Sequence, residues 1–516
     1  MGKQEASELP VDVETEVLIV GGGPVGLTAR ALLARWGVAA LLVEKRTELS
    51  PFPRSRLVNT RSMEIYRQLG LADPIAARGF APEFGRVRFR ETLYGPDFAT
   101  AGMVGINAPI PESPLIGVLT SQDRLEPTLL AAADSPTRFG VELVDLAEEP
   151  ESVVASLVDH QRGERIRVRA KYVLAADGAN STIRQRLGIG TTGPGALGDF
   201  TTVVFDADLA RWRAGQPAGV YFTTYGSFAP LYPEGGWAWF GPTPENPADA
   251  DWAALVSRAL GPGADVEADV LRVQHWQMSA FVADRFRHGR ILLVGDAAHA
   301  MPPIGGLGMN TGIGDAHNLC WKLAGVLRGW AGPNLLDTYE TERHPADEQV
   351  LRQSVANTRL LMEVLNRRER GDSASTEVEV PWSERYFDQL GLVLGQSYRS
   401  AAVLGNGSVA PEVGTEYVPT AEPGHRMPHV WLGDNHSTLD TFGEWFTLLT
   451  ADPARWKQQA TTASPLHIEA LPQEDAERYG LGMDGALLVR PDGHIGARWS
   501  APHDTALHEA LVEITR

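Results

Sequence analysis

Apolar positions near the start of the chain alternate between two periods. Residues 17–20 form a short continuous apolar run that enters glycines, which is typical of a buried parallel strand. A helical repeat follows, carried by Val25, Ala29, Leu32 and Trp36. Gly37 closes that helix, and residues 39–43 give a second strand that ends at Glu44. The pattern predicts a βαβ unit.

The same pattern continues further along the chain and then changes. Residues 170–176 and 290–294 read as further strands, and helices are predicted at 123–133, 181–187, 312–327 and 335–366, the last as one or two helices. Residues 80–117 are rich in Gly, Pro and aromatic residues, which suggests an excursion from the sheet. Residues 193–286 are β-like and aromatic, since Tyr221, Thr223 and Tyr225 alternate. We interpret this region as a sheet that covers a pocket.

From about residue 400 the chain reads as a separate αβ module. Its predicted strands are 430–432, 446–449 and 486–489, with a hairpin turn at 491–493. Residues 367–380 are charged and polar, and we expect them to form a connection between this module and the rest.

Length, charge and cysteine content restrict the class of protein. A chain of 516 residues is long enough for two or three domains. Its formal net charge of −19 argues against nucleic acid or an anionic membrane as the main partner, and no apolar run approaches the roughly 20 residues of a membrane span. The first 16 residues do not read as a signal peptide, and Cys320 is the only cysteine. We expect a cytoplasmic protein whose oligomeric state is left open, with a homodimer as one option.

Gly21, Gly23 and Gly26 form the pattern G-x-G-x-x-G between the first strand and the first helix. The first glycine permits a tight turn, the second lets a pyrophosphate approach the backbone, and the third lets the helix pack on the strand. Glu44 ends the next strand, where a carboxylate can bind adenosine ribose hydroxyls. The alternative for Glu44 is a surface position at a strand end. The arrangement predicts a dinucleotide site.

Basic residues follow that site closely. Arg46 and Arg54 can each neutralise a pyrophosphate through charge-assisted hydrogen bonds. The alternative for each is an arginine that only faces solvent.

A third segment, residues 295–310, indicates FAD among the dinucleotides. Asp296 ends a predicted strand, where a carboxylate can hold a ribityl hydroxyl, and Pro302-Pro303 stiffens the turn that follows. Residues 305–310 then offer backbone N–H groups at a helix start, which suit the anionic edge of a reduced flavin. We interpret His299 as a packed structural histidine rather than a base.

Asp177-Gly178 follows another predicted strand and precedes a helix that carries Arg184. One interpretation is contact with the cofactor and help with a nicotinamide nucleotide. The other is an ordinary strand-to-helix turn with Ser181 as the N-cap.

Taken in order, these segments resemble the FAD-dependent aromatic hydroxylases of the p-hydroxybenzoate hydroxylase class. The resemblance covers about residues 14–370, and the subgroup it is most similar to is the polyketide and phenolic-compound hydroxylases with an added C-terminal domain. The matching runs are VLIVGGGPVGL, PRSRLVNTRSMEIYRQLGL, TSQDRLEPTLL, AADGANSTIRQRLGI and GRILLVGDAAHAMPPIGGLGMNTGIGDAHNLCWKL. The tail, with GHRMPHVWL and DGALLVRPDGHIGARW, looks like the thioredoxin-like domain of that subgroup but has no C-x-x-C.

The resemblance implies an α/β fold with three parts. A Rossmann-like FAD-binding domain would comprise residues 1–80, 115–195 and 285–370. An inserted, mainly β substrate-binding domain would comprise 80–115 and 195–285, and a thioredoxin-like αβ domain would comprise 400–516.

The resemblance also implies roles by position. Arg54 would bind pyrophosphate, Gln122 would touch the FAD, and Asp296 would bind the ribityl chain. The residues expected to act in catalysis are Pro303, Gly306 and Asn310. The residues expected to bind non-covalent FAD are Gly21, Gly23, Pro24, Gly26, Glu44, Lys45, Arg46, Arg54, Gln122, Asp177, Asp296, Pro303, Gly306, Gly308, Met309 and Asn310. No metal site is predicted. The sequence departs from the family at Asn180, where arginine is frequent, and at Leu307, where glutamine is frequent.

The mechanism that the resemblance implies uses NADPH or NADH and O₂ as co-substrates. Reduced FAD would form a C4a-hydroperoxide, whose distal oxygen is attacked by a small aromatic substrate, phenolic or polycyclic. The pocket must exclude water for this chemistry. No base stands out, and His275 is a candidate. The candidates for the substrate pocket, each also a candidate for core packing, are Tyr225, Phe228, Trp237, Trp239 and Met278.

Three other functions stay open on the sequence. Epoxidation or Baeyer–Villiger insertion would use the same scaffold. A flavin halogenase is suggested by GWAWFGP at 236–242, which is similar to G-W-x-W-x-I-P with glycine for isoleucine. A non-catalytic flavin-binding protein could use the C-terminal module for docking.

Overall fold

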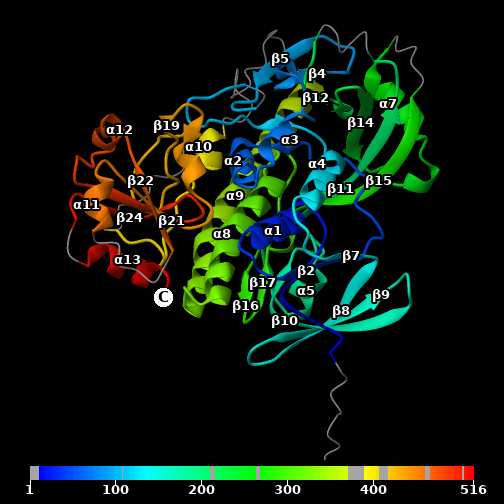
Figure 1. Ribbon diagram of the computed structural model, residues 1–516. Helices are drawn as coiled ribbons and strands as arrows, with labels where there is room; N and C mark the ends of the chain where they lie inside the picture. Colours follow the sequence, from blue (N-terminus) through cyan, green and yellow to red (C-terminus); the bar gives the residue numbers. More distant parts are fainter. Residues whose placement is uncertain are drawn as a thin grey trace, which may run out of the picture.

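The computed structural model describes residues 11–106, 108–209, 216–262, 268–369, 389–405, 416–458, 465–502 and 505–516. Figure 1 shows two larger sheets and a smaller C-terminal unit, with the helices α8 (Gly308–Arg328) and α9 (Asp337–Glu369) running between them. Among the helices in these ranges, none is both long enough and apolar enough to cross a membrane.

The first sheet forms the core of a doubly wound α/β domain. Its strand order is β16-β17-β10-β1-β2-β7, and β9 and β8 extend from β10. The pairs β1·β2, β1·β10, β10·β17 and β2·β7 are parallel. The bounds are β1 Val13–Val20, β2 Ala40–Glu44, β7 Thr137–Phe139, β8 Val141–Glu148, β9 Val153–Asp159, β10 Glu164–Ala175, β16 Arg287–His288 and β17 Ile291–Leu293.

The predicted βαβ unit is confirmed, and it places the motifs. Helix α1 (Pro24–Arg35) joins β1 to β2. The three glycine-rich segments leave the carboxyl ends of β1, β10 and β17, which are neighbours in the sheet. Ligands of such sheets bind outside this edge.

The second sheet has the order β18-β15-β11-β14-β13-β12-β4-β5. The region around residues 80–117 supplies β4 and β5, and β4 pairs in parallel with β12. Helix α7 (Trp252–Leu260) packs on this sheet. The bounds are β4 Arg86–Arg90, β5 Asp97–Gly102, β11 Thr191–Asp206, β12 Val220–Thr223, β13 Gly226–Tyr232, β14 Gly235–Pro242, β15 Asp269–Ala283 and β18 His299–Ala300.

The prediction that the strand alternation continues from Tyr221 and Thr223 to Tyr225 was wrong. Strand β12 ends at Thr223, and Tyr225 lies in the turn to β13, with 41% of its surface exposed. Gly226 forces this turn, because its φ is +112° and an added Cβ would lie 2.5 Å from the Trp239 ring nitrogen.

The C-terminal unit has a four-stranded sheet in the order β22-β21-β23-β24. The predicted hairpin is confirmed, since β23 (Ala486–Val489) pairs antiparallel with β24 (Ile495–Trp499). Strand β21 (Phe446–Thr450) was predicted, but β22 (Leu466–Ala470) was missed. The prediction at 430–432 corresponds to β19 (Trp431–Gly433), which pairs with β20 (His436–Ser437) outside the main sheet. Helices α11 (Pro453–Lys457), α12 (Gln473–Arg478) and α13 (Ala506–Ile514) belong to this unit.

The remaining elements connect these units. Residues 335–366 fall mostly in α9, a single helix despite Pro345, and the expected connection at 367–380 lies outside the described residues beyond Glu369. The other helices are α2 Thr60–Gln68, α3 Ala72–Ala76, α4 Gln122–Ala131, α5 Thr182–Arg186 and α10 Leu390–Leu394. Short 3₁₀ turns span Pro82–Phe84, Pro247–Asp249, Gly295–Ala297, Pro333–Leu336 and Thr438–Thr441, and β3 (Leu57–Val58) pairs with β6 (Val118–Leu119).

Candidate functional site

The turn after β1 has the shape of a phosphate cradle. A Cβ on Gly21, whose φ is +115°, would lie 2.2 Å from the Ala176 carbonyl oxygen, and a Cβ on Gly26 would lie 2.1 Å from that of Gly21. A Cβ on Gly23 would meet no atom within 4 Å. Among the described residues no side chain caps α1, whose first residue is Pro24. The space in front of Gly23 at this helix end is therefore open, as a pyrophosphate site requires.

Glu44 is fixed beside this turn. Its Oε2 accepts a hydrogen bond from the Gly22 N–H at 2.7 Å, and its Oε1 accepts one from the Arg46 N–H at 2.9 Å. The side chains of Lys45 and Arg46 are exposed. The strand end thus presents a carboxylate next to the glycine turn, which fits an adenosine ribose.

The Arg54 side chain is exposed to solvent. Burial of its inner part and the nearby Arg46 lower its pKa, while the carboxylates of Glu126, Asp296 and Glu44 act in the opposite direction. These charges come from three separate segments, so Arg54 lies where the end of β2 and the 295–310 segment converge.

Gln122 begins α4 and faces the segment that carries Arg54. Its Nε2 donates to Glu126 at 2.6 Å, and its Oε1 accepts from the Ser55 N–H at 3.4 Å. Burial raises the pKa of Glu126. The structure therefore brings Gln122 next to the segment of Arg54, and the contact of each residue with FAD stays a prediction.

Asp296 lies in the 3₁₀ turn after β17. Its side chain opens toward the outside, yet the surrounding protein atoms raise its pKa, against the charges of His299 and Arg54. Gly295 has φ +60°, and its N–H donates to Asp315 Oδ2 at 3.0 Å. Arg184 donates to the Ala297 carbonyl at 2.8 Å, so the turn is held on both sides of Asp296.

The turn at 302–308 leads into α8 and exposes backbone groups. Gly305 and Gly306 have φ values of +102° and +66°. No side chain in the described ranges caps the first amides of α8, which begins at Gly308. Pro303 is exposed and Met309 is half-buried. The amides at the start of α8 fit the anionic edge of a flavin ring.

The Asn310 side chain has a task that the sequence did not indicate. Its Oδ1 accepts from the Asn59 N–H at 2.9 Å, and its Nδ2 donates to the carbonyls of Leu57 (2.9 Å) and Gly306 (2.7 Å). It fastens the glycine turn to β3. The prediction that Asn310 meets the flavin edge stays a prediction.

Asp177 lies in a strand-to-helix turn that Ser181 caps, which is the second interpretation of its motif. Its Oδ2 accepts from the Ile183 N–H at 3.2 Å, and Ser181 caps α5 through the Arg184 N–H at 3.0 Å. The other carboxylate oxygen of Asp177 is buried and has no hydrogen-bond partner among the described residues. Contact with a cofactor therefore stays a prediction for that oxygen.

His299 is a structural histidine, as expected. It is fully buried, and its Nε2 lies 2.9 Å from Asp315 Oδ2. Burial alone would lower its pKa, but Asp347 and Asp315 raise it to about 9. Arg343 donates to both carboxylates, at 2.8 and 2.7 Å, so this acidic pair already has a cation.

Comparison with known proteins agrees with this geometry. Residues 14–354 match the family described as "FAD binding domain", and residues 420–515 match "Aromatic-ring hydroxylase, C-terminal". The chain belongs to the FAD-dependent aromatic-ring hydroxylases. It is an FAD-dependent monooxygenase, and FAD is its cofactor.

Relatives of this hydroxylase cover nearly its whole length. It is 35% identical to aklavinone 12-hydroxylase RdmE of Streptomyces purpurascens, over 94% of this chain and 96% of the relative. It is also 35% identical to 4-methyl-5-nitrocatechol 5-monooxygenase of a Burkholderia species, over 95% of each chain. Among solved structures, it is similar to the flavin-dependent monooxygenase PieE in complex with FAD and substrate, with a TM-score of 0.90 and 31% identity, over 98% of this chain and 100% of that chain.

The structure does not bring the five substrate candidates of the hydroxylase together. Phe228, Trp237 and Trp239 are buried in the cluster that packs under α7. The Tyr225 side chain lies outside that cluster in an exposed turn, and its carbonyl accepts from Trp239 Nε1 at 2.9 Å. The alternation along the strands could not distinguish core residues from pocket residues. The structure shows that α7 covers the face that carries Phe228, Trp237 and Trp239, so these three side chains belong to the core.

His275 also belongs to the α7 face. Its Nδ1 lies 2.8 Å from Thr201 Oγ1, and its ring packs on Trp252 of α7 with centroids 5.6 Å apart. This position corrects the idea of His275 as a base, because the ring is engaged on the far side of the sheet from the cavity described next.

Met278 alone among the five candidates lines a cavity. The cavity has a volume of about 530 Å³ and lies between β11, β15 and α9. Asn357 of α9 borders the turn at 302–308, since a Cβ on Gly305 would lie 3.3 Å from its Nδ2. Sequence reasoning missed the contribution of α9, because helical spacing does not say which partner a face meets. The other residues that line the cavity include Leu197, Phe200, Thr358, Arg359 and Met362.

Proposed function

We propose that this monooxygenase hydroxylates a phenolic substrate of more than one ring, and that NADPH or NADH supplies the electrons. The observation that carries the proposal is the cavity of about 530 Å³ between β11, β15 and α9, the helix whose Asn357 borders Gly305. Sites for small molecules commonly measure about 300–1,000 Å³ and are mostly apolar. A relative that acts on aklavinone and one that acts on a substituted catechol support an aromatic substrate.

The lining of the cavity suits a flat aromatic ring system. Leu197, Phe200, Met278 and Met362 are apolar, and Phe200 stacks on Trp276 with centroids 5.3 Å apart and 26° between the planes. Thr358 and Arg359 add a polar side on α9. Glu363 and Asn366 also line this polar side, which supplies partners for phenolic oxygens. Leu197 and Met362 are partly exposed, so a bound ring system must itself displace water from the cavity.

The chain's own residues have separable tasks in this proposal. Bound FAD supplies electron transfer and activation of O₂. The Gly23 turn, Glu44 and Arg54 hold its adenosine and pyrophosphate, and Asp296 holds the ribityl chain. The amides near Gly308 face the ring edge where negative charge develops, and Pro303 and Gly306 shape the backbone there.

A panel of single-ring and polycyclic phenols tests the proposal. We expect polycyclic phenols to stimulate NADPH or NADH oxidation most and to yield a product heavier by one oxygen atom. Product structure by NMR distinguishes ring hydroxylation from epoxidation or Baeyer–Villiger insertion. A chloride-dependent product would indicate a halogenase instead, and no stimulation across the panel would indicate a non-catalytic flavoprotein.

A cavity-filling variant sharpens this test. Met278→Trp should suppress turnover of polycyclic phenols and spare single-ring phenols. Leu271→Trp is the matched control, because Leu271 lies on the same strand but is 55% exposed. Equal losses in both variants, or full activity of Met278→Trp on polycyclic phenols, would contradict this placement of the substrate. A homodimer, a location in the cytoplasm and the lack of a nucleic-acid partner stay predictions.

A further inference from the structure

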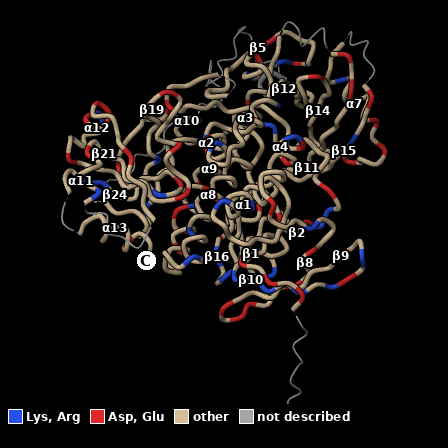
Figure 2. Tube along the Cα trace, in the orientation of Figure 1, with Lys and Arg blue, Asp and Glu red and all other residues tan. Residues whose placement is uncertain are grey.

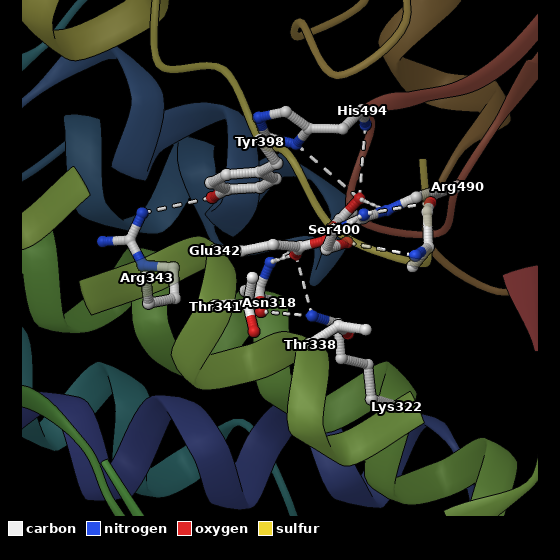
Figure 3. A network of polar contacts seen from close by, with 12 residues as sticks. Asn318, Lys322, Thr338, Thr341, Glu342, Arg343, Tyr398, Ser400, Arg490 and His494 are labelled. Carbon is white, nitrogen blue, oxygen red and sulfur yellow. Dashed lines mark hydrogen bonds and ion pairs between the residues drawn. The ribbon is translucent and has the colours of Figure 1, made fainter. Parts of the chain in front are cut away.

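The C-terminal unit reaches the flavin-binding domain through a buried charged junction (Figure 3). Arg490, next to the β23–β24 turn, donates to Glu342 of α9, with NH2 to Oε2 at 2.8 Å. Lys322 of α8 donates to the same Oε2 at 2.8 Å. Asp492 pairs with Arg490 and accepts from the Trp321 ring N–H at 3.2 Å. These side chains are almost completely buried.

Two acids and two bases balance at this junction. Arginine and lysine lower the pKa of Glu342, although burial alone would raise it, and burial lowers the pKa of Lys322 to about 8. A balanced buried network keeps one arrangement, because moving either side leaves an uncompensated charge. The C-terminal unit is therefore set rigidly on α8 and α9.

Arg343 follows Glu342 on α9 and connects the junction to the flavin site. Arg343 NH1 donates to Gln396 Oε1 at 2.8 Å and to the Tyr398 hydroxyl at 3.1 Å, and of these two partners Tyr398 is the one that contacts the C-terminal unit by stacking on His494. The Tyr398 ring stacks on the His494 ring of the C-terminal unit, with centroids 4.1 Å apart and 27° between the planes. Figure 3 shows Tyr398 between His494 and Arg343. Tyr398 thus joins the hairpin to the guanidinium of Arg343.

Arg343 holds both ends of the segment at 295–310, which is called the flavin segment from here on. Its Nε donates to Asp315 Oδ1 at 2.8 Å, and the other oxygen of Asp315 accepts from the Gly295 N–H at 3.0 Å. Its NH2 donates to the Thr311 carbonyl at 3.3 Å, in the first turn of α8. Gly295 precedes Asp296, and Thr311 follows the amides near Gly308. One arginine therefore fixes both groups that face the cofactor.

We propose that Tyr398 is a positioning residue for FAD, through which the C-terminal unit holds the flavin segment in its binding geometry. The unit has no dithiol, since Cys320 is the only cysteine of the chain. Its contribution is mechanical: His494 and Tyr398 restrict Arg343, and Arg343 sets the backbone at Gly295 and Thr311.

The test uses Tyr398→Phe, which keeps the ring stack and removes the hydroxyl. FAD titration of the apoprotein, without aromatic substrate, should show binding weakened about three- to tenfold, which is less than the full value of a hydrogen bond to a charged group because Tyr398 acts on the FAD site only through Arg343. The visible circular dichroism of the bound flavin should change, whereas the thermal midpoint of the apoprotein should shift little. These readouts do not depend on which substrate is hydroxylated, so they are independent of the proposed function.

Tyr417→Phe is the matched control. The Tyr417 hydroxyl accepts from Arg426 at 3.1 Å, and Arg426 pairs with Glu64 of α2, so this contact also bridges the C-terminal unit to the rest of the protein. It does not lead to Gly295, and FAD affinity should stay within about twofold of wild type.

Two results would overturn the proposal. One is a Tyr398→Phe protein with unchanged FAD affinity and unchanged flavin dichroism. The other is an equal loss in both variants, which would mean general loosening of the junction. Should Tyr398→Phe fail to fold, His494→Leu tests the same chain of contacts from its other end. A folded His494→Leu protein with wild-type FAD affinity would then refute it.

Discussion

The Gly22 N–H donates a hydrogen bond to Glu44 Oε2 across 2.7 Å, so the glycine turn and the end of β2 are held as one unit. Glu44→Gln should weaken FAD binding at least about tenfold, because hydrogen bonds to a charged group are worth about 1.5–3 kcal/mol. Flavin fluorescence titration measures this. Glu48→Gln, a change at an exposed position nearby, is the control. Equal affinities of the Glu44 variant and wild type would contradict the ribose assignment.

Two glycines of the same turn should fail for different reasons. Gly26→Ala should lower the stability of the apoprotein, since its Cβ would lie 2.1 Å from the Gly21 carbonyl oxygen. Gly23→Ala should leave apoprotein stability unchanged and still lose FAD affinity, because its Cβ enters the open space in front of α1. Urea unfolding and FAD titration separate the two. Normal FAD binding by Gly23→Ala would place the pyrophosphate elsewhere.

Asp296→Ala should weaken FAD retention and activity, because the ribityl contact is lost. The flavin content of the purified protein and its turnover are the measurements. Asp337→Ala is the control, since that side chain is 70% exposed and belongs to a surface ion pair. A variant that keeps full yellow colour and unchanged turnover would rule out the assignment.

Arg490→Met should cost about 3–5 kcal/mol of unfolding free energy, because it leaves Asp492 buried without its arginine and Glu342 with Lys322 alone. Arg498→Met in the same unit should cost no more than about 1 kcal/mol, since its pair with Glu422 is partly exposed. Chemical denaturation of both variants gives the comparison. Similar costs would mean that the junction adds little.

His317 predicts a pH dependence of stability. Burial, with the Arg61 charge, lowers its pKa to about 3 from 6.5, so between these values the unfolded chain binds one proton more than the folded protein. Stability from this group is present above pH 6.5 and is lost as pH falls, by up to about 1.4 kcal/mol per pH unit. The difference between wild type and His317→Gln should follow that slope from pH 6.5 to 4 and be flat above pH 7. A constant difference would contradict it.

The sequence predicted the cofactor side of the site well, because that chemistry depends on local pattern. Glycines at strand ends and the carboxylates Glu44 and Asp296 have positions fixed by the sheet edge, and the edge follows from the apolar runs. The structure places these residues at the carboxyl ends of neighbouring strands, and their contacts with FAD stay predictions.

The substrate side depends on which faces meet, and the pattern of a strand does not contain that information. Trp237 and Trp239 alternate correctly on β14, but α7 covers their face. The cavity lies between β11, β15 and α9, and it could not be predicted without knowing where α9 packs. Arg490, Asp492 and Glu342 were equally hidden, since buried charges far apart in sequence read as ordinary surface residues.

The pairing of β18 with β15 has a mechanical consequence. Val282 and Phe281 of the covering sheet pair with His299 and Ala300, which lie between Asp296 and Pro303. The sheet and the flavin segment therefore share one hydrogen-bond ladder and move as a single stiff body. Amide exchange across this ladder should be slow, and the β15 wall of the cavity is tied to the segment that carries Asp296 and Pro303.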